Sequence, residues 1–197
     1  MARTRAEDFD DKRRAILSAA ASVLAEQGAA RASMARIAER AEVSKALLYH
    51  YYPGREALIF AIIETHLREL DAAVSAADDP AARPETRLRT LVHAVLEAYR
   101  DADDAHKVQL DGTPRLPVAE RTAILEIERR VVRRFAGVIR LIAPDLPADK
   151  VMPVTMSLFG MMNWVYMWFR DGGSLSRAGY ADLATDLILG GLPRLIA

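Results

Sequence analysis

The sequence of 197 residues contains no cysteine. Disulfide bonds, thiolate zinc sites and cysteine nucleophiles are therefore excluded, and the composition is compatible with a reducing cytoplasm. The chain also has no net charge, because 27 lysines and arginines balance 27 aspartates and glutamates. Neutrality does not exclude contact with nucleic acid, because phosphates need only local Lys and Arg. The first 58 residues carry ten basic against eight acidic side chains.

Glycine and proline, ten and nine residues respectively, are scarce inside long segments and cluster between them. No alternating run of β-branched residues indicates a strand. Apolar residues recur instead with the period of a helix. Hydrophobic residues make up 51% of the chain, which is enough for a substantial core. We therefore predict an all-α protein.

Motifs of catalysis and of metal binding are also absent. The four histidines, His50, His66, His93 and His106, show no HExxH or other metal-ligand spacing. The sequence has no Gly-rich phosphate loop, nucleophile elbow or paired-carboxylate motif. We expect no enzyme, no metal site and no cofactor.

A secretory signal is missing, because Arg3 and Arg5 lead into acidic rather than apolar residues. We expect a cytoplasmic protein. One stretch favours another class: Val151–Phe169 has no formal charge over nineteen residues, long enough for a transmembrane helix. Pro153 and Asn163 reduce the apolar character of this segment, and a helix buried wholly inside a protein has the same composition. A membrane-associated or structural helical protein is therefore the alternative.

Caps and breakers set the boundaries of the predicted helices. Residues 1–10 are expected to form a polar, flexible arm, and residues 78–84 a linker. The predicted helices are 12–27, a short helix after Ser33, 45–51, 55–77, 85–101, 105–111, 118–142, 151–170, and a last helix from Ser176 to about Leu189.

Residues 33–58 contain two short helices separated by a tight turn, and Ser33 and Ser44 can cap them. This is the helix-turn-helix arrangement, in which the second helix enters the major groove of DNA. The spacing turns Val43, Leu48 and Tyr52 inward. The positions that point outward are Lys45, Ala46, Leu47, Tyr49 and His50.

An outward face of small, apolar and aromatic side chains is unusual for solvent. It suits a DNA groove, where such side chains approach closely and touch thymine methyl groups. Lys45, His50, Tyr51 and Arg55 can reach phosphate oxygens. The two capped helix N-termini add backbone N–H donors. The structural alternative is a helical hairpin that simply packs on its neighbours.

The segment Ile37–Leu58, with Ile16–Gly28 before it, resembles the signature of the TetR family, over about a quarter to a third of the chain. The resemblance implies a DNA-binding domain at residues 1–54. It also implies an all-α effector and dimerisation domain at residues 55–197.

By this resemblance, the outward residues of the second helix contact operator DNA in a homodimeric repressor, and Tyr51 and Arg55 hold the DNA backbone. Two positions depart from the family pattern. Glu42 replaces the usual turn glycine, and a positive φ there costs about 1 kcal/mol. Arg55 stands where Lys is common and keeps the charge.

The uncharged segment 151–170 is rich in methionine and aromatic residues. One interpretation is a core helix that also packs across a dimer interface. The other, for part of the set, is an apolar ligand pocket. A buried Asn163 would need a partner, which is either a ligand carbonyl or a neighbouring backbone group.

Arg129, Arg130, Arg133 and Arg134 lie together on the predicted helix 118–142. They form either a solvated face with i,i+4 pairs or an anion site for the phosphates of a coenzyme A ester. We predict a ligand pocket lined by Tyr99, Arg129, Arg133, Phe159, Asn163 and Met167.

We expect the effector to be an acyl-CoA or another largely apolar small molecule. A second, less specific resemblance supports an acyl-CoA. The segments His106–Leu110, Ile127–Arg130 and Leu158–Ser176 are similar to TetR-type repressors of fatty-acid, phenylacetate or sterol-ring breakdown, which respond to acyl-CoA thioesters.

We also predict that helices 151–170 and 176–189 pair with their symmetry mates in the dimer. The second helix offers Leu183, Leu187 and Ile188 for this contact, and Ala184 would allow close approach.

Overall fold

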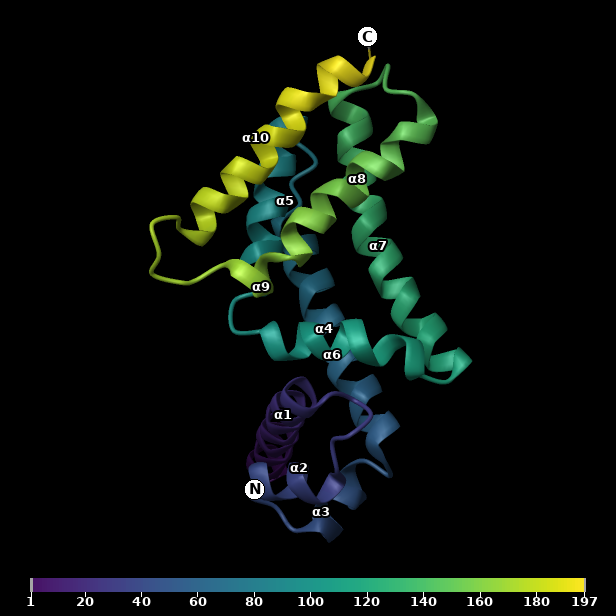
Figure 1. Ribbon diagram of the computed structural model, residues 1–197, viewed down its shortest axis with the longest axis vertical. Coiled ribbons are helices and arrows are strands. Elements are labelled where there is room, and N and C mark those ends of the chain that lie inside the picture. The colour runs from purple at the N-terminus through teal and green to yellow at the C-terminus, as the bar shows by residue number, and fades with distance from the viewer. Residues whose placement is uncertain (1, 197) are drawn as a thin grey trace. The chain divides into compact units, whose positions relative to one another are not determined.

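The computed structural model describes residues 2–196, with the side chains of Phe9 and of residues 11–196. Every regular element in this range is a helix, which confirms the predicted all-α class (Figure 1). The helices are α1 Ala2–Gln27, α2 Met34–Arg40, α3 Lys45–Tyr51, α4 Arg55–Ala77, α5 Pro84–Ala98, α6 Asp103–Gly112, the 3₁₀ turn η1 Thr113–Arg115, α7 Val118–Ile142, α8 Ala148–Asn163, α9 Val165–Trp168 and α10 Arg177–Ile196.

The chain divides into two compact units. The first unit combines Met1–Arg68 with Asp101–Leu125, and the second combines Glu69–Arg100 with Glu126–Ala197. Two of the three breaks fall inside long helices, α4 and α7, so each of these helices contributes to both units, and the third lies between α5 and α6. The predicted functional boundary between residues 54 and 55 is a different division, and it stays a prediction.

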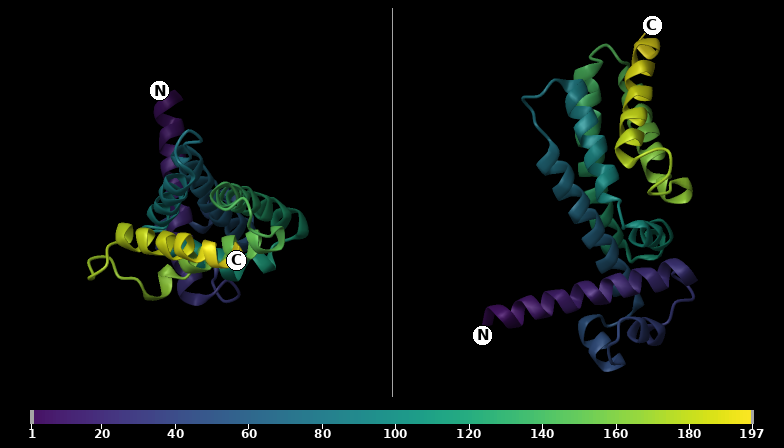
Figure 2. Two further views of the ribbon diagram at one scale, coloured as in Figure 1. Left: turned by 90° about the horizontal axis from the view of Figure 1, so that it is seen from above. Right: turned by 90° about the vertical axis from the view of Figure 1, so that its left-hand side faces the viewer.

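Helix α1 is the central element of the first unit, and Figure 2 shows it as one unbroken helix above α2 and α3. Ile16, Ala20 and Val23 are fully buried on one face of α1, because they recur at the spacing of a helix. The predicted flexible arm was wrong for residues 2–10, which form the first turns of α1. No glycine or proline interrupts the sequence from Ala2 to Gln27, so nothing in it ends the helix earlier.

The turn between α2 and α3 has the backbone predicted from the sequence. Glu42 adopts φ 53°, the left-handed conformation that glycine would take at lower cost. The Val43 amide donates to the Ala38 carbonyl at 3.0 Å, which closes the turn. Leu48 and Tyr52 are buried as expected, and Val43 is half-buried.

Helices α5, α8 and α10 form the body of the second unit, with α10 packed along α5 and also against α8. Leu88, Leu91 and Val95 of α5 are fully buried. Phe135 of α7 meets Phe159 of α8 edge to face, with ring centroids 5.0 Å apart. The core of this unit therefore comes from segments far apart in the sequence.

The apolar segment 151–169 is not one helix, contrary to the prediction. Helix α8 ends at Asn163, Trp164 breaks it, and the four-residue α9 follows. The Tyr180 hydroxyl donates to the Met161 carbonyl at 3.0 Å and satisfies one of the carbonyl groups that a helix end leaves open. No helix in residues 2–196 combines the length and the apolar composition needed to cross a membrane.

Two further helix ends differ from the predictions. Helix α10 continues past Leu189 to Ile196, because Gly190 and Gly191 keep helical backbone rather than the positive φ that ends a helix. Helix α5 ends at Ala98 rather than Asp101, and Asp101 itself adopts φ 58°.

Candidate DNA-binding surface and effector site

Helix α3 presents the outward face predicted from the sequence. Lys45, Ala46, Tyr49 and His50 are exposed, with Tyr49 at 51% of its full exposure, and Leu47 is half-buried. Leu48 is fully buried and anchors the helix to the unit beneath it. An anchored helix with an exposed Tyr and flanking cations can enter a DNA groove without rearrangement.

The two predicted caps hold the starts of α2 and α3. The Ser33 hydroxyl accepts from the Arg36 amide at 3.2 Å, and the Ser44 hydroxyl accepts from the Leu47 amide at 3.1 Å. Each bond satisfies one of the amides that a helix start leaves open. Ser33 and Ser44 therefore fix the geometry of the two helices even before any DNA is bound.

Tyr51 and Arg55, the predicted backbone-holding residues, both have partners within the first unit. The Tyr51 ring stacks on Phe9 with centroids 4.9 Å apart. Arg55 Nη1 donates to the Ala30 carbonyl at 2.8 Å. Sequence reasoning missed Phe9, although a lone aromatic residue in an otherwise polar segment was a usable signal.

A surface cleft of about 520 Å³ lies beside α3. Arg31, Lys45 and Arg55 contribute cations to its lining, Glu56 contributes one carboxylate, and Ser33 and Tyr49 add hydroxyl groups. This mixture suits an anion such as a phosphate group. Arg31 was not predicted, because it precedes the motif.

The histidines show no metal-binding arrangement. Among the residues that the structure describes, no group of three or more His, Asp or Glu side chains could hold a metal ion. His66 and His106 meet edge to face inside the first unit, with ring centroids 6.1 Å apart. Burial, with a smaller contribution from His106, lowers the pKa of His66 to about 4, so this ring is neutral at neutral pH.

In the second unit, the structure brings together two of the predicted ligand residues. The Tyr99 hydroxyl donates to Asn163 Oδ1 at 2.8 Å, so the partner that Asn163 needs is a side chain of the chain itself. Tyr99 is buried, and burial together with the nearby Glu128 charge raises the pKa of its phenol. This hydrogen-bonded pair, with Tyr99 buried and Asn163 half-buried, is a polar contact between α8 and the residue that follows α5.

The run of four arginines on α7 separates into two pairs. Arg130 contacts Asp71 at 3.1 Å, and Arg134 contacts the buried Asp78 at 2.8 Å. Arg129 and Arg133 are exposed. The ion pairs of Arg130 and Arg134 bind α4 to α7, whereas Arg129 and Arg133 are exposed on the same helix and accessible to an anion.

The other two predicted ligand residues have different environments. Phe159 is buried against Phe135, whereas Met167 is 53% exposed on α9. Of the six residues, Tyr99 and Asn163 are in direct contact, and an effector site that uses all six is a proposal.

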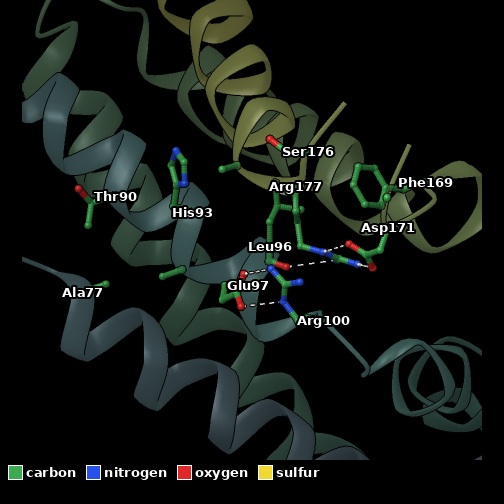
Figure 3. Close-up of a pocket in the computed structure, with 13 residues that line it drawn as sticks. Ala77, Thr90, His93, Leu96, Glu97, Arg100, Phe169, Asp171, Ser176 and Arg177 are labelled. Carbon is green, nitrogen blue, oxygen red and sulfur yellow. Dashed lines mark hydrogen bonds and ion pairs between the residues drawn. The ribbon is translucent and has the colours of Figure 1, made fainter. Parts of the chain in front are cut away.

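The second unit also has an open cleft that sequence reasoning missed (Figure 3). It has a volume of about 650 Å³ and contains none of the six predicted ligand residues. Arg177 lies at its floor, where Nη2 contacts Asp171 at 2.7 Å and Nη1 donates to the Leu96 carbonyl at 3.3 Å. The Arg177 guanidinium also lies 4.9 Å from the centre of the Phe169 ring. Each cation is balanced by a neighbouring acid, as Arg100 is by Glu97.

Apolar side chains are exposed on α8 and α10, the helices predicted to form a dimer interface. Met152, Met156, Leu183 and Leu187 are each close to half exposed or more. Ala184 is different: it is fully buried within its own chain, so it cannot contact a partner as predicted. The reason is that α5 and α8 already cover that side of α10.

Comparisons with known proteins decide the family. Residues 81–192, more than half of the chain, match the domain described as "Tetracyclin repressor-like, C-terminal domain". Residues 16–62 match the domain described as "Bacterial regulatory proteins, tetR family".

The chain belongs to the TetR family.

Several known proteins are similar to this TetR-family chain over nearly its whole length. A TetR-family transcriptional regulator from Bordetella parapertussis is 30% identical with a TM-score of 0.85, covering 94% of this chain and 97% of that one. A crystal structure of AibR in complex with isovaleryl coenzyme A and operator DNA is 26% identical with a TM-score of 0.78, covering 89% and 97%. The transcriptional repressor KstR2 of Mycobacterium tuberculosis is 25% identical over 96% of both chains.

Other curated relatives match over a shorter range. The transcriptional regulator BetI of Brucella suis is 32% identical over 93 residues, which is 47% of this chain and 47% of the relative. Together with the helix-turn-helix match at residues 16–62, these likenesses identify a DNA-binding transcriptional regulator.

Proposed function

We propose that this TetR-family regulator is a repressor that binds a pseudo-palindromic operator as a homodimer and is released by an acyl-CoA ester. The observation that carries the proposal is the outward face of α3. This face exposes Lys45, Tyr49 and His50, and buried Leu48 anchors the helix from the opposite side. Lys45, Ala46, Leu47, Tyr49 and His50 meet the base edges and flanking phosphates in this proposal.

The phosphates of the DNA backbone are contacted by a second set of residues, namely Ser33, Ser44, Tyr51 and Arg55. The two serine caps orient the backbone amides at the starts of α2 and α3, and Arg55 supplies a permanent positive charge. Arg55→Ala should weaken binding to all sequences alike and flatten the dependence of affinity on salt, because its contact is to phosphate. Arg68→Ala, an exposed arginine on the same helix, is the matched control. An unchanged salt slope in Arg55→Ala would remove Arg55 from the backbone contact.

The dimer uses the exposed apolar face of α8 and α10. Met152, Met156, Leu183 and Leu187 together expose an apolar surface of the kind that a partner covers. A two-fold interface presents the same patch from both copies, so half-sites related by that axis follow.

The acyl-CoA effector is supported by the likeness to AibR, whose crystal structure contains isovaleryl coenzyme A and operator DNA, and by the Tyr99–Asn163 pair. A ligand carbonyl entering between these side chains would exchange their 2.8 Å hydrogen bond for its own. The apolar side chains of Phe159 and Met167 select the acyl group, and exposed Arg129 and Arg133 bind the nucleotide phosphates. A ligand that prefers the opened state then shifts the dimer away from DNA.

The test uses an operator selected from a randomised duplex pool with the purified protein. Fluorescence anisotropy then follows release of that duplex during titration with isovaleryl-CoA, phenylacetyl-CoA, medium- and long-chain acyl-CoAs and free CoA, while calorimetry measures binding. We expect at least one acyl-CoA to release DNA and free CoA to fail. Binding of none, or binding without release, would reject the effector and leave the DNA-binding assignment intact.

A double variant locates the nucleotide. Arg129→Ala with Arg133→Ala should lose the ligand response and keep operator affinity. Arg121→Ala with Arg140→Ala, two exposed arginines of the same helix, is the matched control. An unchanged response in the first double variant would return Arg129 and Arg133 to an ordinary solvated face.

A further inference from the structure

The turn between α1 and α2 determines where the helix-turn-helix begins. Gly28 ends α1 with φ 81°, and its carbonyl accepts from the amides of Arg31 and Ala32 at 3.1 and 3.2 Å. Ser33, the cap of α2, follows directly. Because the turn is short and closed, a displacement of its backbone also displaces the start of α2.

Two charged side chains from distant parts of the first unit hold this turn. Asp111 Oδ2 on α6 accepts from the Ala29 amide at 2.9 Å, across 82 positions of sequence. Arg55 on α4 donates to the next carbonyl, that of Ala30, at 2.8 Å. Hydrogen bonds with one ionised partner are roughly twice as strong as neutral ones. Ala29 is 2% exposed, so its amide would be left buried without the carboxylate.

The Asp111 carboxylate is itself fixed in place. Arg115 Nη2 contacts Asp111 Oδ1 at 3.3 Å, on the oxygen that does not face the turn. The next residue, Gly112, lets α6 approach α4 closely, since a Cβ atom there would lie 2.7 Å from Ile59 Cγ2. The Ala29 hydrogen bond is the foremost cause of the lowered pKa of Asp111, so the carboxylate is ionised at neutral pH.

We infer that Asp111 is a positioning residue for operator binding, which holds the Gly28–Ser33 turn and thereby the orientation of α2 and α3. The inference rests on the proposed DNA-binding surface of α3. Asp111 has no direct contact with DNA in this role, because a carboxylate and a phosphate repel each other. Helix α6 thus acts on DNA affinity through one side chain and one backbone amide.

Removing Asp111 takes away both a negative charge and the anchor of the turn, and these two losses have opposite effects on DNA affinity. Loss of a negative charge from the DNA-binding unit alone should strengthen binding. Loss of the anchor should instead weaken binding of Asp111→Ala to the selected operator by about tenfold, with the salt slope unchanged. Asp111→Asn keeps an acceptor oxygen without the charge and should stay within about threefold of wild type.

Asp103→Ala is the matched control, because Asp103 is an exposed carboxylate on the same helix. It removes the same charge and should leave the operator affinity unchanged or slightly stronger. A second readout needs no DNA: hydrogen exchange of the Ala29 amide, followed by NMR, should accelerate in Asp111→Ala and not in Asp103→Ala.

An Asp111→Ala protein that bound the operator as tightly as wild type or more tightly would overturn the inference. So would an equal loss in Asp103→Ala, or Ala29 exchange at the wild-type rate in Asp111→Ala. If wild-type protein bound no selected duplex, the proposed DNA-binding surface would fail first and the inference with it, so the two failures are distinguishable.

Discussion

The proposed DNA-binding surface and the proposed effector site are built in opposite ways. The DNA-binding surface consists of exposed side chains on α3, held by a buried leucine and two serine caps that are neighbours in sequence. The proposed effector site depends on contacts between distant segments, such as Tyr99 with Asn163 and Phe159 with Phe135. A local surface can be derived from a motif, whereas a site assembled from separate helices depends on how they pack.

The largest expected effect separates the two protomers of the proposed homodimer. Leu187→Glu places a charge on the exposed apolar face of α10 in both copies, where Leu187 is 58% exposed. A charge buried at an interface without a partner costs several kcal/mol, so the dissociation constant should rise by about a hundredfold or more. Sedimentation velocity at micromolar concentration measures the change.

Leu141→Glu on α7 is the control, since Leu141 is 59% exposed and lies outside the predicted interface. A Leu187→Glu protein that sediments as a dimer would remove α10 from the interface. Ala184→Glu is unsuitable for this purpose, because Ala184 is buried within its own chain and the variant would unfold.

The next effect concerns base recognition. Tyr49→Ala should weaken binding to the selected operator by roughly tenfold or more, because a side chain that reads base edges supplies about 1–3 kcal/mol of discrimination. Binding to a scrambled duplex should change little. Leu110→Ala, another exposed apolar residue of the same unit, serves as control. An equal loss on both duplexes would mean that Tyr49 contacts the backbone instead.

A third prediction concerns acid stability in the second unit. Hydrogen bonding from Arg87, with a further contribution from Arg134, lowers the pKa of Asp78. A lowered folded-state pKa stabilises the protein above the unfolded pKa, and this contribution is lost as pH falls through the folded value.

Asp78→Asn should therefore lower the thermal midpoint at pH 7 by roughly 5 °C or more and have little effect near pH 3. Differential scanning calorimetry from pH 3 to 7 checks this. Asp145→Asn, an exposed site in the same unit, should show neither effect. A pH-independent loss in Asp78→Asn would assign the effect to packing rather than charge.

The smallest effect tests the polar anchor of the effector site. Tyr99→Phe removes the donor to Asn163 and should cost about 1 kcal/mol, or about 2–4 °C in thermal midpoint. Operator affinity without ligand should be unchanged, while the acyl-CoA response should weaken. Tyr180→Phe removes a comparable hydroxyl bond, to Met161, and should keep the response. Equal responses in both variants would remove Tyr99 from the effector site.

Local signals predicted much of the fold. The bounds of α3, α4 and α7 agree with those expected from caps and breakers, and Glu42 adopts the expected positive φ. Helix α8 ends earlier than predicted, at a point where residues distant in sequence contact it: Tyr99 forms a hydrogen bond to Asn163, and Tyr180 forms one to the Met161 carbonyl. The sequence of the segment alone does not contain this information. The start of α1 at Ala2 shows that charge alone is a poor signal of a flexible arm.

The candidate sites divide in the same way. Periodicity identified the outward face of α3, because one buried leucine fixes that helix. The same reasoning failed for Ala184, since a helical pattern shows a face but not the neighbour that covers it. The cleft around Arg177 escaped prediction because its lining comes from four separate parts of the chain: the end of α4, helix α5, the loop that follows α9, and the start of α10.

Hydroxyl-radical footprinting of the protein on its selected operator tests the central claim most directly. A homodimer that inserts one α3 into each half-site should protect two symmetric patches on one face of the duplex. Their centres should lie about 34–36 Å apart or at a multiple of that spacing, and Tyr49→Ala should weaken both patches equally. A single asymmetric patch, or protection that Tyr49→Ala leaves intact, would contradict operator reading by paired α3 helices.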